Sequence, residues 1–477
     1  MSFSSQLCRY LLCAAVIAAL GCEQASTLDQ IQARGVLNVA TRNGPVTYFP
    51  ALIGHDGFEY QLANEFADYL GVELNMVSVF GRDDVFRRLK YGKADLASAG
   101  LIITPAKLKD VRYSAAYYQT QPRVIYKLGN RKPRKLEDLY NKRIAVGADS
   151  YFGSFLEDLK IDHPNIKWKA VFDLEAIDLM DQLNKGQLDF AILGEHEFVA
   201  HRGIYPRLSL GMRLGSTQRI AWAMQRGNGR AASLYTELDR FLKEMQSSGR
   251  LKQLQERYFS HFEDINQADA LEFAGNVQRR LPIYEKLIRA VATEFNMPWE
   301  LLAAISYQES HWNPNAVSPT GVVGMMMLTQ ATAAQVNIED RANLEQSLRG
   351  GAGYFKDMLA KIPEDVSEPD RTWFALAAYN VGYGHLEDAR KLTESQGFDP
   401  HIWLDLKEHL PLLRQRKWYS RTRYGYARGN EPVTYVHNIR HYYQVLRLHE
   451  IARERVRPPV EMSHRAPEVL SRTIPAI

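Results

Sequence analysis

The residue of this sequence best placed for acid–base chemistry is Glu309. Pro298 is typical of the first position of a helix, and the residues after it have helical spacing. Leu301, Leu302 and Ile305 form an apolar face of that helix, and Glu309 extends this face by one turn. A carboxyl group there can be set against a groove, where partial burial disfavours its ionisation and raises its pKa. Such a group can hold a proton near neutral pH and act as a general acid.

Several short polar or glycine-containing motifs follow Glu309 along the chain. Ser310 is its neighbour, and the chain continues through Asn313-Pro-Asn-Ala316, Gly324-Met-Met-Met327 and, further on, Ala377-Ala-Tyr-Asn380. This series resembles the catalytic domain of the soluble lytic transglycosylase type, which has a lysozyme-like fold. The resemblance implies that Glu309 is the catalytic acid and base of an enzyme that cleaves peptidoglycan.

The same resemblance implies substrate contacts for six residues. They are Ser310, Met325, Met327, Tyr379, Asn380 and Tyr435. Met327 stands where the family usually has a glutamine, which removes an amide that could hydrogen-bond a sugar. Met325 and Met327 have a second interpretation as simple core residues, because thioether side chains fill gaps in apolar cores.

A single carboxyl group suffices for this reaction only if the substrate supplies the nucleophile. Glycosidases ordinarily use two carboxyl groups that flank the bond, and no second acid occupies a motif position of this domain. In the family that the motifs resemble, the acid protonates the glycosidic oxygen between MurNAc and GlcNAc. The same carboxylate then takes the proton of the C6 hydroxyl, which closes a 1,6-anhydro ring without consuming water. The resemblance therefore implies a lyase, an exotransglycosylase, that needs no metal and no cofactor.

The residues before about position 262 predict an α/β domain. Residues 36–39 and 72–76 have the alternating pattern of strands, whereas residues 58–70 and 83–92 have helical patterns. Strands separated by helices favour βαβ units in an open sheet. Five segments resemble, in order, the first lobe of the periplasmic solute-binding proteins that capture amino acids, which implies a bilobal domain. These segments are Gly35-Val-Leu-Asn-Val-Ala40, Gly57-Phe-Glu, Gly92-Lys-Ala-Asp-Leu, Gly100-Leu-Ile-Ile-Thr-Pro105 and Val111-Arg-Tyr-Ser-Ala-Ala-Tyr-Tyr118.

The residues that hold the ligand in that family are replaced in this chain. Lys107 stands at the position of the arginine that grips the ligand carboxylate, and Gly194, followed by Glu195, stands at the position of an aspartate. A lysine offers a point charge instead of a planar guanidinium fork, so the binding geometry differs. We expect a regulatory ligand, a muropeptide or an amino acid, near Lys107 and Glu195. The alternative for Lys107 is a solvated surface lysine.

Helical patterns dominate after residue 266, and strand patterns are nearly absent there. We therefore predict a bilobal α/β solute-binding-type domain, non-catalytic and regulatory, followed by a mainly α, lysozyme-like transglycosylase domain. The expected boundaries are 1–21 for a signal peptide, 22–266 for the solute-binding-type domain, 267–456 for the transglycosylase domain and 457–477 for a disordered tail.

All three cysteines lie in the first 22 residues, at positions 8, 13 and 22. This excludes a disulfide framework, a thiolate zinc site and a cysteine nucleophile in the remainder of the chain. Arg9 followed by an apolar run is typical of a secretory signal. The end of that run, Ala19-Leu-Gly-Cys22, resembles the lipobox of bacterial lipoproteins, which implies lipidation of Cys22; a chance cysteine is the alternative. Glu23, rather than an aspartate, implies the periplasmic face of the outer membrane.

The composition argues against other classes of protein. The 477 residues carry 59 Lys and Arg against 55 Asp and Glu, a net charge of +4 without long blocks of one sign, so nucleic acid is not a favoured partner. No apolar run beyond residue 21 is long enough for a membrane-spanning helix. The two histidines of a zinc-protease helix are four residues apart and lie on one face of the helix. His196 and His201 are five residues apart, so they do not share a helix face. The basic and aromatic segment 414–424 is either a contact with glycan strands or a solvated surface.

The two domains and the signal together resemble the membrane-bound lytic murein transglycosylases. This resemblance implies peptidoglycan glycan strands as substrate and attachment to the outer membrane through a lipid. Two alternatives stay open: a non-catalytic periplasmic sensor of wall fragments, and a lysozyme-type hydrolase whose product has a reducing end. The sequence also leaves exolytic and endolytic cleavage open.

Overall fold

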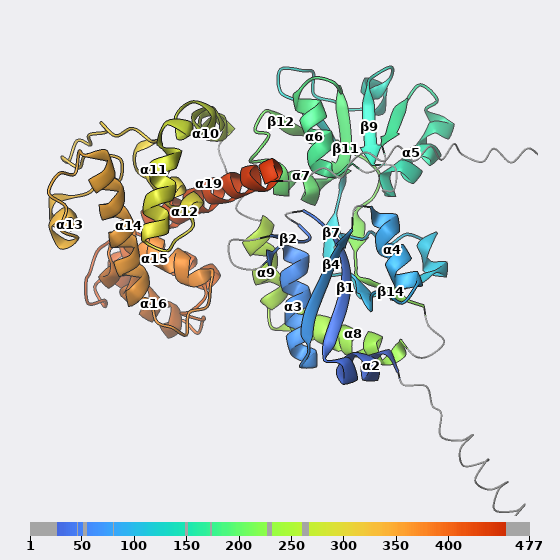
Figure 1. The fold of residues 1–477 in the computed structure, drawn as a ribbon, viewed down its shortest axis with the longest axis horizontal. Helices are drawn as coiled ribbons and strands as arrows, with labels where there is room; N and C mark the ends of the chain where they lie inside the picture. Colours follow the sequence, from blue (N-terminus) through green and yellow to red (C-terminus); the bar gives the residue numbers. More distant parts are fainter. Residues whose placement is uncertain are drawn as a thin grey trace, which may run out of the picture.

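The computed structural model describes residues 26–44, 46–50, 55–79, 81–147, 151–171, 174–226, 231–259 and 267–454. The expected signal peptide, Cys22 and the expected tail 457–477 lie outside these residues. The described chain forms an α/β domain and a helical domain that lie side by side (Figure 1). The fold class predicted from the sequence is therefore confirmed. No helix within these ranges is both long and apolar enough to cross a membrane.

The first lobe of the α/β domain is built on one sheet. Its strands are β1 (Val36–Arg42), β4 (Glu73–Val79), β5 (Leu96–Ala97), β6 (Val111–Tyr113) and β14 (Ala223–Gln225). They lie in the order β4-β1-β5-β14-β6, with β1 parallel to β4 and β5 and with β14 antiparallel to its neighbours. The helices of this lobe are α2 (Thr27–Arg34), α3 (Phe58–Leu70), α4 (Arg82–Lys90), α8 (Ala232–Ser247) and α9 (Arg250–Phe259).

The local elements predicted for this lobe are present. α3 covers the predicted helix 58–70 and buries Leu62 and Phe66 on the face that their four-residue spacing predicts. α3 ends at Gly71, whose φ of 70° gives the left-handed conformation that a glycine adopts at low cost. Shorter elements near this lobe are β2 (Phe49–Pro50), β3 (His55–Asp56) and the 3₁₀ turn Lys107–Lys109.

The second lobe has its own five-stranded sheet. Its strands are β8 (Pro122–Lys127), β9 (Ile144–Gly147), β10 (Trp168–Val171), β11 (Phe190–Gly194) and β12 (Leu208–Arg213), in the order β10-β9-β11-β8-β12. Its helical segments are the 3₁₀ turn Leu136–Leu139, α5 (Tyr151–Asp162), α6 (Ala176–Asn184) and α7 (Glu195–His201). The chain passes between the lobes through β7 (Tyr118–Thr120) and β13 (Gln218–Ile220), which pair antiparallel with each other. Two crossing strands of this kind are suited to act as a hinge.

The helical domain consists of the segments after residue 266. They are α10 (Gln267–Arg279), α11 (Leu281–Glu294), α12 (Trp299–Ser310), α13 (Gln330–Gln335), α14 (Leu344–Lys361), α15 (Asp370–Val381), α16 (Tyr383–Ser395), α17 (Trp403–His409), the 3₁₀ turn Leu410–Arg414, α18 (Arg416–Tyr419) and α19 (Asn430–Glu454). α12 and α15 form the centre, and α19 packs against both of them. Seven consecutive residues of α12, 301–307, are buried, so this helix is apolar all round rather than on a single face.

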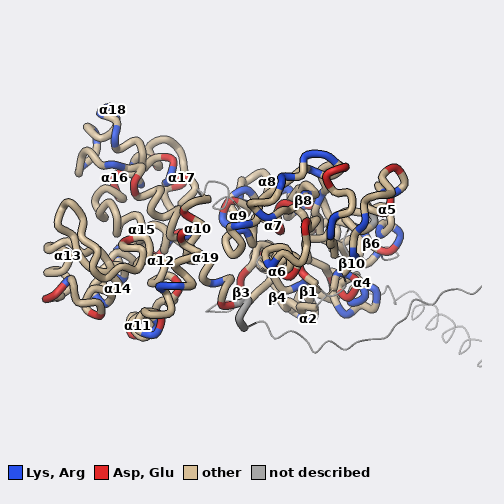
Figure 2. Tube along the Cα trace, turned by 90° about the horizontal axis from the view of Figure 1, so that it is seen from above, with Lys and Arg blue, Asp and Glu red and all other residues tan. Residues whose placement is uncertain are grey.

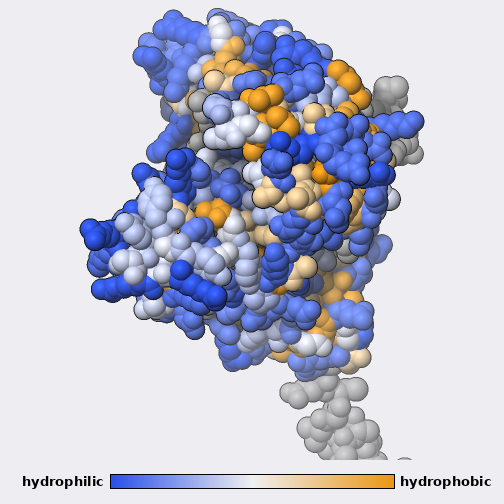
Figure 3. All heavy atoms as spheres, turned by 90° about the vertical axis from the view of Figure 1, so that its left-hand side faces the viewer, coloured by the Kyte–Doolittle hydropathy of each residue, from blue (hydrophilic) through white to orange (hydrophobic). Residues whose placement is uncertain are grey.

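The two domains meet along α19 and α9. In Figure 1 the red helix α19 extends from the helical domain toward the α/β domain. Arg447 of α19 lies 3.3 Å from Asp56, and Lys407 of α17 lies 2.8 Å from Glu256 of α9. Charges of both signs are interspersed over the two domains (Figure 2). Figure 3 views the molecule from the side of the helical domain, where a hollow crosses a mostly hydrophilic face.

Candidate active site

Glu309 lies in the last turn of α12, where the helix ends abruptly. His311 and Trp312 both have positive φ values, 52° and 55°, so the chain leaves the helix axis directly after Ser310. Trp312 is fully buried, and its indole N–H donates to the backbone oxygen of Ala303 at 2.9 Å. The buried tryptophan therefore fixes the end of the helix, and with it the position of the Glu309 side chain.

Tyr435 is the hydrogen-bond partner of Glu309. Its hydroxyl donates to Oε1 of Glu309 at 2.5 Å. Burial raises the pKa of Glu309 to about 7, although the hydrogen bond from Tyr435 lowers it. In the described part of the chain, no charged side chain contributes to this shift. Glu309 can therefore be protonated or ionised near neutral pH, which a group that must serve as both acid and base requires.

Aromatic side chains from three helices form one wall of the site. Tyr379 of α15 stacks on Tyr435 with their ring centroids 6.1 Å apart, and Tyr354 of α14 meets Tyr379 edge-on at 5.1 Å. Burial and the charge of Glu309 raise the pKa of both Tyr379 and Tyr435 well above the usual value, so both hydroxyls stay protonated. The hydroxyl of Tyr379 is buried and has no hydrogen-bond partner among the described residues. The donor of this hydroxyl is thus unused in the described structure. Asn380, the next residue, is exposed.

Ser310 links the end of α12 by hydrogen bonds to the turn Gly324–Met327, which we call the methionine turn. Its hydroxyl donates to the backbone oxygen of Met325 at 2.8 Å and accepts the N–H of Asn313 at 3.2 Å. Met325 is completely buried, which agrees with the alternative interpretation of a core side chain. Met327 is partly exposed and has a φ of 45°. Gly324 has a φ of 89°, and a Cβ at this position would lie 2.0 Å from the backbone oxygen of Arg341, so this turn admits no other residue without moving.

The structure brings together most of the residues predicted for the site. Glu309, Tyr379 and Tyr435 lie in one cluster, and Ser310 and Met325 adjoin it. The sequence motif implies only a substrate contact for Tyr435, whereas its hydroxyl bonds the carboxyl group of Glu309 itself. Tyr354 was not predicted, because it lies in the helical pattern of α14 and matches no motif.

The two residues predicted to hold a regulatory ligand lie in different surroundings. Nζ of Lys107 is 3.4 Å from Asp83 and 4.6 Å from the ring centroid of Phe86, and its side chain is 37% exposed. Glu195 begins α7, and its N–H donates to the backbone oxygen of Gln121. Within the described ranges, no three His, Cys, Asp or Glu side chains are grouped so that they could hold a metal ion.

Two family models match the chain in succession. Residues 37–261 match the bacterial extracellular solute-binding proteins, family 3, and residues 286–402 match the transglycosylase SLT domain. The membrane-bound lytic murein transglycosylase F of Ectopseudomonas mendocina is 45% identical over 424 residues, which are 88% of this chain and 86% of that protein. The chain belongs to this family. The corresponding protein of Hahella chejuensis is 43% identical over 440 residues, 91% of this chain and 86% of its own.

The transglycosylase model covers Glu309, Ser310, Tyr379 and Asn380, whereas Tyr435 lies beyond its last matched residue. The lytic transglycosylase F relatives match most of this chain, 88% and 91% of it in the two proteins named above, so the match is longer than either domain. Among solved structures, that of a mutant ArgBP from T. maritima resembles this chain with a TM-score of 0.44 and 27% identity, over 49% of this chain and 99% of that one.

Proposed function

We propose that this chain cleaves the β-1,4 bond between MurNAc and GlcNAc of peptidoglycan and that Glu309 supplies both the acid and the base. The chain is a lytic transglycosylase by family, and hence a lyase of the cell wall. The observation that supports the role of Glu309 is its pKa of about 7 beside a single hydrogen-bond donor. A proton can move onto and off such a group near neutral pH at little cost.

The proposed reaction has two proton transfers. Protonated Glu309 donates its proton to the glycosidic oxygen as the bond to C1 breaks, and the 2-acetamido group or the ring steadies the positive charge at C1. The Glu309 carboxylate, held by Tyr435, then takes the proton from the C6 hydroxyl while that oxygen bonds to C1. The carboxyl group ends in its starting state, and no water is consumed. Tyr379, Asn380, Ser310 and the methionine turn are the proposed sugar contacts.

The mass of the product tests this proposal. Purified sacculi treated with the protein should release muropeptides that end in a 1,6-anhydro ring and are lighter by one water than lysozyme products. A reducing end on every product would identify a hydrolase instead. If no product forms while the protein still binds sacculi, the non-catalytic sensor is correct. Longer anhydro-ended fragments at early times would indicate endolytic rather than exolytic cleavage.

We propose attachment to the periplasmic face of the outer membrane through a lipid on Cys22. The supporting observations are the lipobox-like Ala19-Leu-Gly-Cys22 and the membrane-bound relatives that share most of the chain. Peptidoglycan lies within reach of that face, so the location agrees with the proposed substrate.

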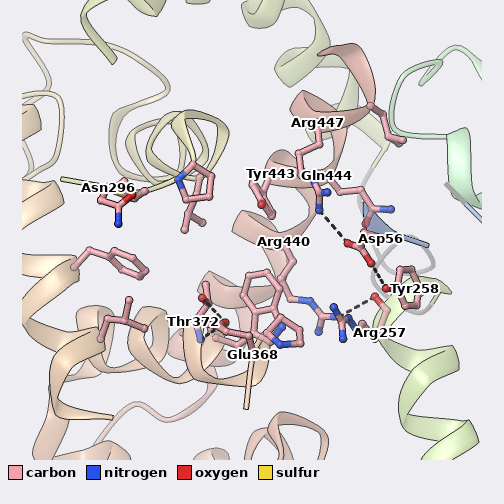
Figure 4. A pocket seen from close by; sticks show the side chains of 18 of the residues that line it. Asp56, Arg257, Tyr258, Asn296, Glu368, Thr372, Arg440, Tyr443, Gln444 and Arg447 are labelled. Atoms are coloured by element: carbon pink, nitrogen blue, oxygen red, sulfur yellow. Dashed lines mark hydrogen bonds and ion pairs between the residues drawn. The ribbon is translucent and has the colours of Figure 1, made fainter. Parts of the chain in front are cut away.

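The first domain is proposed to regulate the second, and α19 is the physical connection. Near one end of α19, Tyr435 bonds Glu309. Further along, Arg440 donates to the backbone oxygen of Arg257, and Arg447 pairs with Asp56. Figure 4 shows Arg447 directed at Asp56, whose carboxylate is also approached by the hydroxyl of Tyr258. These contacts border a cavity of about 380 Å³ between the domains.

Muropeptides that bind the first domain are therefore expected to change turnover at Glu309. A ligand shifts activity only through its different affinities for two states, and couplings of about 1–3 kcal/mol correspond to about 5- to 150-fold. Turnover should be measured during a muropeptide titration for the whole chain, for the Asp56→Asn variant and for a fragment that starts at residue 267. We expect a response of the whole chain, a weaker one of Asp56→Asn and none of the fragment. If the turnover of the whole chain does not change with any muropeptide that it binds, the first domain serves as a tether and not as a regulator.

A further inference from the structure

One segment of the helical domain, residues 410–429, carries positive charges only. No Asp or Glu occurs between Glu408 and Glu431. The cations of the segment are all exposed, and they are Arg414, Arg416, Lys417, Arg421, Arg423 and Arg428. Among the described residues only Arg428 has an ion pair, with Glu431 at 3.3 Å. The other five cations are therefore free to pair with charges from outside the chain. We call residues 414–428 the basic rim.

Aromatic side chains are interleaved with the cations of the basic rim. Tyr424 and Tyr426 are 51% and 55% exposed. Lys417 lies over the ring of Trp418 at 4.8 Å. Arginine and aromatic side chains are enriched at binding interfaces, where aromatic rings combine apolar area with a polar tip. The rim therefore has the composition of a binding surface.

The chain before and after the basic rim meets at a narrow neck. There the N–H of Ala427 donates to the backbone oxygen of Leu413 at 3.2 Å. A Cβ at Gly429 would lie 1.7 Å from the backbone oxygen of Leu410, so only a glycine allows this approach. The neck leads directly into α19, the helix that carries the hydrogen-bond partner of Glu309. The position of the rim is thus linked to that of the catalytic carboxyl group.

A buried carboxylate fixes the middle of the basic rim to α16. Asp388 is 1% exposed, and it accepts the backbone N–H of Arg423 at 3.1 Å and that of Tyr424 at 2.8 Å. The ring of Tyr424 packs on Gly384, where a Cβ would lie 2.8 Å from it. Gly384 is in the first turn of α16, four residues after Asn380. Figure 2 shows α18, with the Lys and Arg of the rim, near α16 at one extremity of the helical domain.

We propose that the basic rim binds the free carboxylates of peptide stems on the glycan strand that is being cleaved, and so selects strands whose stems are ionised. The stems supply the negative charge of peptidoglycan, because the carboxyl group of each MurNAc is used in the bond to its stem. Guanidinium groups match carboxylates in shape as well as in charge. Arg421 and Arg423 are the assigned specificity residues, because they lie in the part of the rim next to α16. This inference rests on the proposed cleavage of peptidoglycan and adds its selectivity.

The contribution of the basic rim is expected to be electrostatic. Charge of one sign at a binding surface raises the association rate of opposite charges by about 10- to 1000-fold, and salt weakens this effect. The rim should therefore act on kcat/KM, which reports productive association. The screening length falls from about 10 Å at 0.1 M salt to about 3 Å at 1 M. The selectivity should accordingly disappear at high salt.

The test compares glycan strands that differ only in the charge of their stems. One substrate is soluble strands with intact stems, and the other is the same strands after their stem carboxyl groups are amidated with carbodiimide and ammonia. At about 0.1 M salt, the unchanged chain should cleave the ionised strands with a kcat/KM about tenfold higher, which is the lower end of such steering effects. At about 1 M salt the two values should be equal.

Arg421→Gln with Arg423→Gln should abolish this selectivity. The double variant is expected to cleave ionised strands no faster than amidated ones, and circular dichroism should show an intact fold because both side chains are exposed. The matched control is Lys286→Gln with Lys361→Gln, which removes the same charge from exposed positions of α11 and α14, at the opposite extremity of the helical domain in Figure 2. The control should keep the tenfold ratio. The first domain is identical in all variants, so a changed ratio reports the rim.

A ratio in the Arg421→Gln, Arg423→Gln protein equal to that of the unchanged chain would overturn the proposal, even if activity falls equally on both strands. Equal cleavage of the two strands by the unchanged chain would also overturn it. If the unchanged chain forms no anhydro product from either strand, the proposed cleavage fails, and co-sedimentation with sacculi tests the rim separately. There the double variant should bind ionised sacculi about tenfold more weakly than the unchanged chain. Equal binding by the two proteins would refute the assignment of the rim.

Discussion

Replacing Glu309 by glutamine is expected to lower the release of muropeptides from sacculi by at least about a thousandfold. A positioned acid–base group contributes about 10²- to 10⁴-fold to a rate, and Glu309 is proposed to act in both proton transfers. Glutamine has nearly the same shape and can still accept the hydrogen bond of Tyr435. Glutamine cannot donate a proton to the glycosidic oxygen or accept one from the C6 hydroxyl. The substitution should therefore lower turnover and leave the fold intact.

Glu300 provides the matched control for this substitution. It lies in the first turn of the same helix, and burial raises its pKa as well, but it is more than two turns away from the site. Glu300→Gln should therefore cleave sacculi at close to the unchanged rate. Chromatography of soluble muropeptides measures both variants. Near-normal cleavage by Glu309→Gln would remove Glu309 from the mechanism and reopen the search for the acid.

Replacing Glu309 by glutamine is also expected to change how the stability of the protein depends on pH. The pKa of Glu309 is raised from 4.5 to about 7 in the folded protein, so the folded state holds the proton more tightly than the unfolded state. The stability that comes from this proton is present below pH 4.5 and is lost as the pH rises through 7. Above pH 7 the buried charge costs at most about 3 kcal/mol. Thermal unfolding should therefore show Glu309→Gln to be more stable than the unchanged chain at pH 8.

Removing the hydroxyl of Tyr435 is expected to change both the rate and its dependence on pH. The hydrogen bond favours the ionised form of Glu309, so Tyr435→Phe should raise the pKa of this carboxyl further above 7. Glu309 must be protonated to begin the reaction, and kcat/KM should fall on the alkaline side as it ionises. This alkaline limb should move to higher pH in Tyr435→Phe. A hydrogen bond to a charged group contributes about 1.5–3 kcal/mol, so the maximal rate should fall by about 10- to 150-fold.

Tyr379→Phe separates this effect from a general disturbance of the aromatic wall. The ring of Tyr379 stacks on Tyr435, but its hydroxyl makes no hydrogen bond to a described residue. Its removal should leave the alkaline limb where it is, although KM is expected to rise because a proposed sugar contact is lost. If both variants shift the limb equally, the shift reports altered packing rather than the Tyr435–Glu309 bond.

Local sequence patterns were sufficient to locate the helix of Glu309 and the strands and helices of the first lobe. The apolar residues before Glu309 predict a helix with one apolar face and a partly buried carboxyl at its end, and burial is what raises the pKa of this group. The motif Ala377-Ala-Tyr-Asn380 likewise predicted Tyr379 as part of the site. These features depend on neighbours within a few turns of one helix or on a short motif, and both are visible in the chain itself.

The partners of the charged groups were decided only by the tertiary structure. Tyr435 reaches Glu309 across 126 positions because α19 packs against α12, and no local pattern encodes that contact. In the first domain, sequence motifs predict that Lys107 and Glu195 hold the ligand. Folding instead directs Arg42 and Arg82 at Glu175 and Glu197, because the end of β1 and the start of α4 face the starts of α6 and α7. Ion pairs of this kind depend on which element ends face each other in space, and that depends on the packing of the whole domain.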